Sequence, residues 1–257
     1  MSSFVKTLMT AAMIPALALS TSAALAAFSD SQQKEIQGVV DNYLKNNPQT
    51  IISALQGFQQ KQMQEAEKTI KDTQKSAGQY VKALFHTAND PLGGNPNGTV
   101  TVVEFFDYQC AHCVTMAPVI SDAMKGNTNV RFIFKEFPIR GPLSDFAARA
   151  ALAANMQGKY MPFHDALLKA SQPYTKESIL AVAKSVGLNV EQLQKDMDSA
   201  SVQDQIKANM KLAQDLKLLG TPAFFIGKTD ATASSNISYI PGQMDINQLQ
   251  DLIKKSN

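Results

Sequence analysis

The chain carries a run of β-branched and aromatic residues from Thr99 to Phe106, and this composition predicts a buried strand. Soon after it, apolar residues recur at helical spacing at Val114, Ala117, Pro118, Ile120 and Met124. The segment Cys110-Ala111-His112-Cys113 lies between the two patterns. The pattern therefore places two cysteines where a central strand turns into a helix.

The rest of the C-terminal part alternates between strand and helix patterns. A second strand is predicted over 129–137, and a helical block follows at about 142–219. Two short strands are then expected at 223–226 and 237–240, before a last helix capped by Asp245. Strands on both sides of a helical block predict an α/β sheet domain over 89–257 with a helical insertion.

Residues 27–88 are predicted to form a separate helical region. Ser29 or Ser31 can cap a first helix, and Asn46-Asn47-Pro48 ends it. The second helix begins apolar, becomes polar over 59–79 and regains apolar residues up to Leu84. Such a helix has too little of its own to bury, so we expect this region to hold a homodimer together. The Pro-, Gly- and Asn-rich loop at 89–98 marks its boundary.

The first 26 residues have the pattern of a secretory signal peptide. Lys6 supplies a positive start, an apolar stretch follows to Leu19, and Ala24-Leu25-Ala26 is a small-residue cleavage site. The mature chain is expected to begin at Ala27 or Phe28. An exported protein is therefore predicted.

The charge balance argues against several classes of partner. The chain has 24 Lys and Arg residues against 22 Asp and Glu residues, which leaves a net charge of +2. A balance this near to neutral gives no electrostatic reason to expect binding to nucleic acid or to an anionic membrane surface. No stretch beyond the signal segment is long and apolar enough to span a bilayer.

Cys110 and Cys113 are the only cysteines in the chain. They would close a very short loop, which gives little stabilisation, so a purely structural disulfide explains them poorly. A zinc site normally needs four ligands, and the three histidines lack ligand spacing. A reversible redox pair is the favoured interpretation, with Cys110 near a helix N-terminus that stabilises its thiolate. The alternative is a metal-binding or structural envelope protein that uses the N-terminal helices for assembly.

Three separated motifs resemble the DsbA type of thioredoxin-fold protein, a family of periplasmic thiol–disulfide oxidoreductases. They are Glu-Phe-Phe-x-x-x-Cys-x-His-Cys, Phe-Lys-Glu-Phe-Pro and Gly-Thr-Pro before a strand. The helical arm is similar to that of the suppressor-of-copper-sensitivity C proteins. The resemblance implies periplasmic localisation, a redox-active disulfide as the only redox group, and a cis peptide at Thr221–Pro222. It also implies unfolded or misoxidised exported proteins as substrates and a membrane redox partner.

The resemblance gives roles to five residues around the motif. Cys110 is expected to be the more exposed nucleophile, and Cys113 the buried resolving thiol. His112 is expected to favour the Cys110 thiolate. Thr221 and Pro222 are expected to lie against the cysteines and to bind an extended substrate segment.

Glu104 is an acid in an apolar strand, and its pKa is expected to be raised there. It is interpreted as the group that exchanges protons with Cys113, with pairing to Lys135 as the alternative. The methionines and His164 are interpreted as packing residues. Oxidase and isomerase activity both remain open, because His112 favours oxidation and the arm favours isomerisation.

Overall fold

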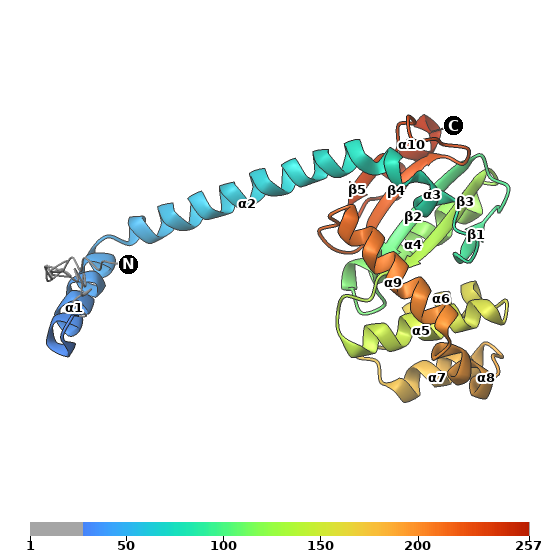
Figure 1. The fold of residues 1–257 in the computed structure, drawn as a ribbon, viewed down its shortest axis with the longest axis horizontal. Coiled ribbons are helices and arrows are strands. Elements are labelled where there is room, and N and C mark those ends of the chain that lie inside the picture. The colour runs from blue at the N-terminus through green and yellow to red at the C-terminus, as the bar shows by residue number, and fades with distance from the viewer. Residues whose placement is uncertain (1–27, 257) are drawn as a thin grey trace, which may run out of the picture. The chain divides into compact units, whose positions relative to one another are not determined.

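The computed structural model describes residues 28–256, and the chain divides into two compact units that meet between Gln59 and Gln60 (Figure 1). The signal peptide expected at residues 1–26 lies outside the described residues. Within the described range, no helix combines the length and the apolar character that a membrane crossing requires.

The second unit is built on a sheet of five described strands in the order β1-β3-β2-β4-β5. The central strand β2 pairs in parallel with β3, while the other neighbouring pairs are antiparallel. Their bounds are β1 Leu92–Gly94, β2 Val100–Phe106, β3 Val130–Glu136, β4 Ala223–Lys228 and β5 Ser238–Pro241. The three innermost strands are almost wholly buried, as their continuous apolar sequences predict.

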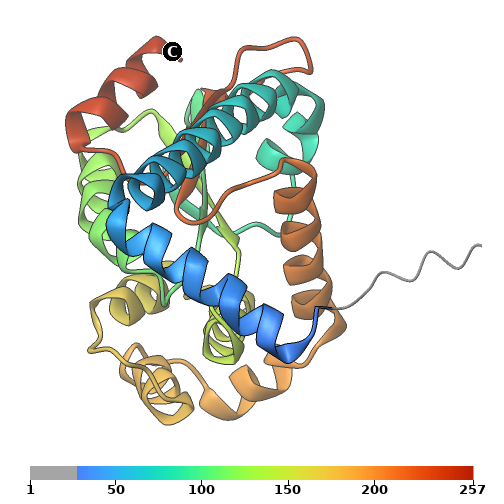
Figure 2. The same cartoon turned by 90° about the vertical axis from the view of Figure 1, so that its left-hand side faces the viewer.

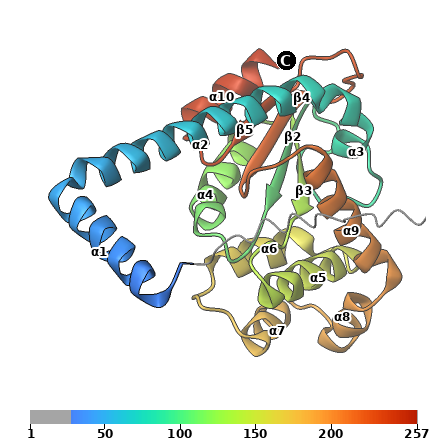
Figure 3. The same ribbon diagram turned by 60° about the vertical axis from the view of Figure 1, so that its left-hand side comes forward.

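Helices cover both faces of this sheet. Figure 2 shows α4 and α9 on opposite sides of the strands, and Figure 3 shows α5 to α8 gathered at one end of the sheet. The bounds are α4 Ala111–Gly126, α5 Pro142–Met156, α6 Tyr160–Lys169, α7 Lys176–Ser185, α8 Val190–Met197, α9 Ala200–Asp215 and α10 Ile246–Lys255. A mixed sheet with helices on both faces and a helical block between β3 and β4 is the α/β architecture that the sequence predicted.

The alternation of side chains along β2 separates two hydrophobic cores. Val102 and Phe106 belong to the core on the face where α4 packs, together with both cysteines. Val103 and Phe105 belong to the core on the other face, together with residues of α9. Because side chains of a strand alternate between faces, Glu104 points to the same face as Val102 and Phe106. Glu104, the one acid in the predicted apolar strand, therefore lies on the same side of the sheet as the cysteines.

The last part of the N-terminal helical region packs on the second core. Helix α2 spans Pro48–Ser76, and a short 3₁₀ turn η1 (Ala77–Tyr80) and helix α3 (Val81–Phe85) follow it. Ala77, Leu84 and Phe85 are buried there, and the Thr73 hydroxyl donates to the carbonyl of Leu216 at 2.7 Å. These residues belong to the fold of the second unit, so a shortened chain must retain them to keep this core intact.

The first unit contains α1 (Asp30–Asn46) and the beginning of α2. Ser29 caps α1 through a capping box with Gln32, and Asn47 ends the helix, as predicted. No residue of α1 is buried. Most of the large apolar side chains of this unit are exposed: Phe28, Ile36, Val39, Val40, Tyr43, Ile51, Ile52, Leu55 and Phe58.

Two details of the predicted elements are wrong. The segment at 89–98 was expected to be a loop throughout, but Leu92–Gly94 forms the edge strand β1 against β3. Glycine has a low strand propensity, so Gly93 and Gly94 do not suggest a strand. Gly94 is nevertheless required, because it has φ +66° and a Cβ there would lie 2.6 Å from the Val130 carbonyl oxygen. In addition, the second helix was expected to reach Leu84, but α2 ends at Ser76, and η1 and α3 follow it.

Candidate functional site

Cys110 is the residue that caps the N-terminus of α4. The backbone of Cys110 is extended, and the residue ends the loop that joins β2 to α4. Its carbonyl accepts the N–H of Val114 at 3.0 Å. The free N–H groups of the first helical turn and the helix dipole therefore lie next to its sulfur. Both cysteines are free thiols in this structure.

The expected difference in exposure between the two cysteines is wrong. The exposed fraction of Cys110 is 0%, and that of Cys113 is 2%. Cys110 is covered because its thiol donates to the carbonyl oxygen of Thr221 at 3.2 Å, and Nη2 of Arg140 lies 3.6 Å from the sulfur. Neither thiol is open to solvent, but Cys113 lies deeper in the protein, and burial changes its pKa much more than that of Cys110.

The two thiols differ strongly in acidity. Burial alone would raise the pKa of Cys110, but hydrogen bonds from the Thr221 side chain and from Cys113 outweigh burial and lower this pKa. The backbone of His112 acts in the same direction. Burial raises the pKa of Cys113 far above its ordinary value, and the charge of Glu104 raises it further. Cys110 is therefore the more acidic of the two thiols and the one that more readily forms a thiolate.

Thr221 faces Cys110 through two groups. Its carbonyl accepts the Cys110 thiol, and its buried side-chain hydroxyl has no other hydrogen-bond partner among the described residues. This hydroxyl can therefore donate to the sulfur of Cys110 and stabilise its thiolate. The peptide between Thr221 and Pro222 is cis, as the resemblance implied, and the Pro222 carbonyl accepts the N–H of Gly242 at 2.8 Å.

Glu104 lies on the face of β2 that carries the cysteines, and its exposed fraction is 3%. Burial raises its pKa from 4.5 to about 8, and the negative charge of Cys110 adds to this rise. Its carboxyl has no hydrogen bond or ion pair within the part of the chain that the structure describes. The alternative pairing with Lys135 is wrong, because the Lys135 ammonium is buried against the Asp90 carboxylate instead.

His112 is exposed on the first turn of α4, and its Nδ1 lies 2.8 Å from Oε1 of Gln243. The ring is therefore engaged with the loop before α10. What His112 supplies to Cys110 in this structure is its backbone N–H.

The structure adds residues that the sequence reasoning missed. Asp107, the first residue after β2, is 1% exposed and accepts hydrogen bonds from the N–H groups of Gln109, Ile139 and Arg140. It also accepts the hydroxyl of Ser144 at 2.7 Å. The sequence could have indicated Asp107, because it is an acid directly after a buried strand. It contains no pattern that would indicate Arg140, which lies 30 positions after Cys110.

A buried polar cluster lies beneath the cysteine loop. The Tyr160 hydroxyl donates to Glu136 at 2.8 Å, and the Tyr108 hydroxyl lies 3.0 Å from Nδ1 of His164. Burial raises the pKa of Glu136, and it lowers the pKa of His164 to about 3, so the His164 ring is neutral at pH 7. His164 also packs against Phe106, which confirms its interpretation as a packing residue.

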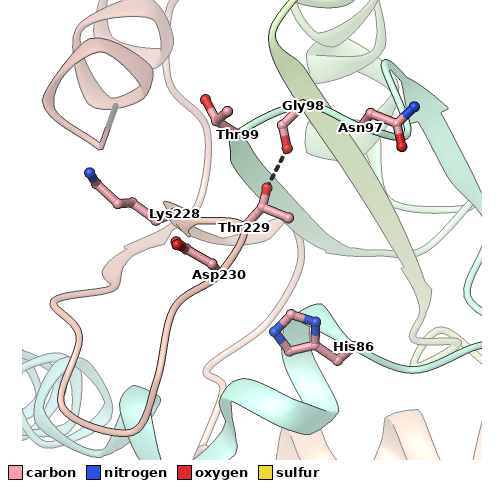
Figure 4. A pocket seen from close by; sticks show the side chains of 7 residues that line it. All are labelled: His86, Asn97, Gly98, Thr99, Lys228, Thr229 and Asp230. Atoms are coloured by element: carbon pink, nitrogen blue, oxygen red, sulfur yellow. Dashed lines mark hydrogen bonds between the residues drawn. The ribbon is translucent and has the colours of Figure 1, made fainter.

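Other parts of the described chain offer no comparable chemistry. Among residues 28–256, no three His, Cys, Asp or Glu side chains lie close enough together to hold a metal ion. A pocket of about 620 Å³ lies at the opposite end of β2 from the cysteines (Figure 4). Its walls include His86, Lys228 and Asp230, and the Thr229 hydroxyl donates to the Gly98 carbonyl across its floor at 2.6 Å.

The chain is similar to proteins of known structure. A thioredoxin-like oxidoreductase from Silicibacter pomeroyi is 43% identical, covers 68% of this chain and 95% of its own, and superposes with a TM-score of 0.62. BcfH from Salmonella enterica Typhimurium is 33% identical, with 88% of this chain and 96% of that chain covered and a TM-score of 0.64.

Curated relatives match over the sheet domain. A probable disulfide bond formation protein D from Bacillus cereus is 30% identical over 156 residues, which are 56% of this chain and 72% of that protein. The Na(+)/H(+) antiporter NhaA 3 of Salinispora tropica is 27% identical over 139 residues, or 53% of this chain. The chain spans only about a fifth of that antiporter's length, 21%.

Two family models match in succession. The model of the copper resistance protein ScsC N-terminal domain matches residues 32–65, and the model of the DSBA-like thioredoxin domain matches residues 101–254. The second match covers more than half of the chain and includes both cysteines, Glu104 and the Thr221–Pro222 peptide. The chain therefore belongs to the family of DsbA-like thioredoxin domains, and it carries an ScsC-type N-terminal domain ahead of it.

Proposed function

We propose that the chain is an exported thiol–disulfide oxidoreductase that forms or isomerises disulfide bonds in periplasmic proteins through Cys110 and Cys113. Members of its family act on substrate proteins, interact with membrane redox partners and use a redox-active cysteine pair without an external cofactor. The observation that carries the proposal is the difference between the two buried thiols, of which only Cys110 has a lowered pKa.

In the oxidative direction the reaction begins from the Cys110–Cys113 disulfide. A substrate thiolate attacks Sγ of Cys110, the bond between the two cysteines breaks, and the electron pair goes to Cys113. A second substrate thiolate then attacks the substrate sulfur of this mixed disulfide and expels Cys110. The substrate loses two electrons and gains a disulfide, and the cysteine pair gains the two electrons.

Proton transfer follows from the acidity of the surrounding groups. The thiolate released at Cys113 is buried, and its raised pKa requires it to take up a proton. We assign this proton to Glu104, whose pKa of about 8 leaves it protonated at neutral pH. Oxidation of the two substrate thiols releases two protons: one restores the proton of Glu104, and the other goes to water because Cys110 is released as a thiolate. His112 supports this thiolate through its backbone N–H.

The substrate segment is proposed to bind at Thr221 and Pro222. The Thr221 carbonyl lies 3.2 Å from the Cys110 sulfur, so a chain that reaches this sulfur passes the Thr221–Pro222 backbone. An extended peptide recognised through its main chain gives little sequence selectivity, which suits an enzyme that acts on many unfolded proteins.

The N-terminal arm is proposed to form a homodimer. The apolar side chains of α1 and early α2 are about half exposed, with Tyr43 at 54% and Leu55 at 55%. Each such side chain contributes roughly 1.5–3 kcal/mol when fully buried, and a second copy of the arm supplies a matching apolar surface. Two Cys110 sites held together favour repeated attack on one misoxidised substrate, which is the task of an isomerase.

The chemical part of the proposal is tested with Cys110→Ser. The wild-type chain is expected to reduce insulin, to oxidise a reduced model peptide and to reshuffle scrambled ribonuclease, and the variant is expected to do none of these. Its thermal unfolding should stay close to that of the reduced wild type. Stoichiometric copper or zinc binding by a wild-type chain that is inactive in all three assays would instead support the metal-binding alternative.

The arm is tested with a shortened chain that begins at Gln60 and so retains η1 and α3. Light scattering is expected to give a dimer for the chain from Phe28 and a monomer for the shortened chain. The shortened chain should still oxidise the peptide, but it should lose most of its ability to reshuffle scrambled ribonuclease. A monomer in both cases would separate the arm from the mechanism.

A further inference from the structure

We propose that Arg140 is a further catalytic residue, whose guanidinium stabilises the thiolate of Cys110, and that Asp107 is the positioning residue that holds it there. This inference rests on the function proposed above for the cysteine pair. Neither residue follows from the Cys-x-x-Cys motif, since Arg140 comes from the loop between β3 and α5.

The contact between Arg140 and Cys110 joins a cation directly to the reacting sulfur. Nη2 of Arg140 donates to Sγ of Cys110 at 3.6 Å. A guanidinium brings both a positive charge and hydrogen-bond donors, so it can stabilise a thiolate beside it. A neighbouring arginine is one of the features that lower the pKa of reactive cysteines. Because the rest of Arg140 is exposed, water screens part of this effect.

Asp107 fixes the backbone of Arg140 relative to the cysteine loop. Its Oδ2 accepts the N–H of Ile139 at 2.8 Å and that of Arg140 at 3.0 Å. Its Oδ1 accepts the N–H of Gln109 at 2.7 Å and the hydroxyl of Ser144 at 2.7 Å. One buried carboxylate therefore binds the residue before Cys110, the loop of Arg140 and the first turn of α5 together.

The local backbone supports the same placement. Gly141, directly after Arg140, has φ +95°, a conformation that other residues rarely adopt, and it begins the turn into α5. The Gln109 side chain donates to the Arg140 carbonyl at 3.4 Å. Arg140 is thus held at both its N–H and its carbonyl, and from this fixed backbone its side chain reaches the Cys110 sulfur.

The role inferred for Arg140 is the one that the sequence analysis gave to the ring of His112. That ring bonds to Gln243 at 2.8 Å, and His112 acts on Cys110 through its backbone. The ionisable groups that act on the Cys110 sulfur are Arg140, Cys113 and Glu104. Of these, Arg140 alone brings a positive charge.

The charge matters in the step that releases the substrate. A substrate thiolate forms a new bond to the substrate sulfur of the mixed disulfide, and the bond from that sulfur to Cys110 breaks. The electron pair moves to Sγ of Cys110, and the negative charge appears 3.6 Å from the guanidinium. A better stabilised thiolate is a better leaving group and makes the disulfide form a stronger oxidant.

The test compares Arg140→Gln and Arg140→Lys with Arg149→Gln in the full mature chain. Arg149 lies on α5 and pairs with Asp145 of the same helix and with Asp198 at the end of α8, so its substitution makes the same charge change without touching the cysteines. The two readouts are the ultraviolet absorbance titration of the Cys110 thiolate and the redox equilibrium with glutathione.

For Arg140→Gln we expect the Cys110 pKa to rise by about one unit. The equilibrium constant with glutathione should fall about tenfold towards a weaker oxidant, which corresponds to about 30 mV. Arg140→Lys should restore most of both values, 1 M salt should shrink the difference, and Arg149→Gln should match the wild type. A titration and an equilibrium unchanged in Arg140→Gln would overturn the inference.

Asp107→Asn tests the positioning role through non-additivity. The amide of this variant has a single oxygen and cannot accept all four hydrogen bonds, so the loop of Arg140 should loosen. The Cys110 pKa should then rise, with no further rise when Arg140→Gln is added. Fully additive shifts would show that Asp107 does not act through Arg140. Because the titration needs no protein substrate, failure of all three activity assays in the wild type would refute the proposed function and leave this result standing.

Discussion

Replacing Glu104 by Gln should remove a pH-dependent penalty from the folded protein. The pKa of Glu104 is raised from 4.5 to about 8, so the folded state holds a proton that the unfolded state loses near pH 4.5. Between these two values the unfolded state binds fewer protons, and the stability of the wild type therefore falls as the pH rises. Glutamine carries no charge at any pH and does not contribute this slope.

The magnitude follows from the size of the rise. Each pH unit between 4.5 and about 8 costs about 1.36 kcal/mol, so the full effect is roughly 5 kcal/mol once Glu104 is ionised in the folded state. This is a large share of the roughly 5–15 kcal/mol that stabilises a typical domain. The charge of Cys110 contributes to the rise, so the slope should extend to higher pH in the reduced protein than in the oxidised one.

The assay is urea unfolding of the reduced wild type and Glu104→Gln at half-unit steps from pH 4 to pH 9. The difference in the free energy of unfolding between the two should be constant near pH 4 and should grow in favour of the variant up to about pH 8. Buried groups that Glu104 does not influence, such as His164, titrate in both proteins and cancel in this difference, whereas Glu136 and Cys113 respond to the charge of Glu104 and contribute to it. Glu191→Gln, at an exposed acid on α8, is the matched control and should run parallel to the wild type.

Parallel curves for the wild type and Glu104→Gln across this range would refute the reasoning. They would mean that the Glu104 carboxyl is as well solvated in the folded protein as in the unfolded chain. The proton assigned to Glu104 in the reaction would then have to come from another group.

Three other predictions concern separate parts of the chain. Lys135→Met leaves the Asp90 carboxylate buried without its partner, and urea unfolding at pH 7 should show a loss of about 3–5 kcal/mol, whereas Lys135→Met combined with Asp90→Leu should recover much of it. Cys113→Ser should accumulate mixed disulfides through Cys110 on non-reducing gels, and adducts that persist in Cys110→Ser would reverse the roles of the two thiols. Leu55→Asp should turn the proposed dimer into a monomer by light scattering without changing peptide oxidation, while Gln56→Asp, its exposed polar neighbour, should remain dimeric.

The sequence by itself determined the order of the main elements and the position of the cysteines. Local chemistry is sufficient for these features: the β-branched run before Cys110 can form little other than a buried strand, and Ser29, Ser199 and Asp245 begin helices because their side chains accept free N–H groups. The alternation along β2 even placed Glu104 in apolar surroundings. The three motifs then sufficed to indicate the family, which the family models confirm.

The tertiary structure decided which side chains act on the sulfur. Arg140 and Thr221 lie 30 and 111 positions from Cys110, and they reach it because β3 ends and β4 begins beside the end of β2. Lys135 pairs with Asp90 rather than with Glu104 because it points to the opposite face of the sheet, where α3 packs. Edge strand β1 exists only through its partner β3, since Gly93 and Gly94 have no strand preference of their own. Contacts of this kind join segments that are far apart in the sequence and adjacent only in the folded chain. A local sequence pattern therefore carries no information about them.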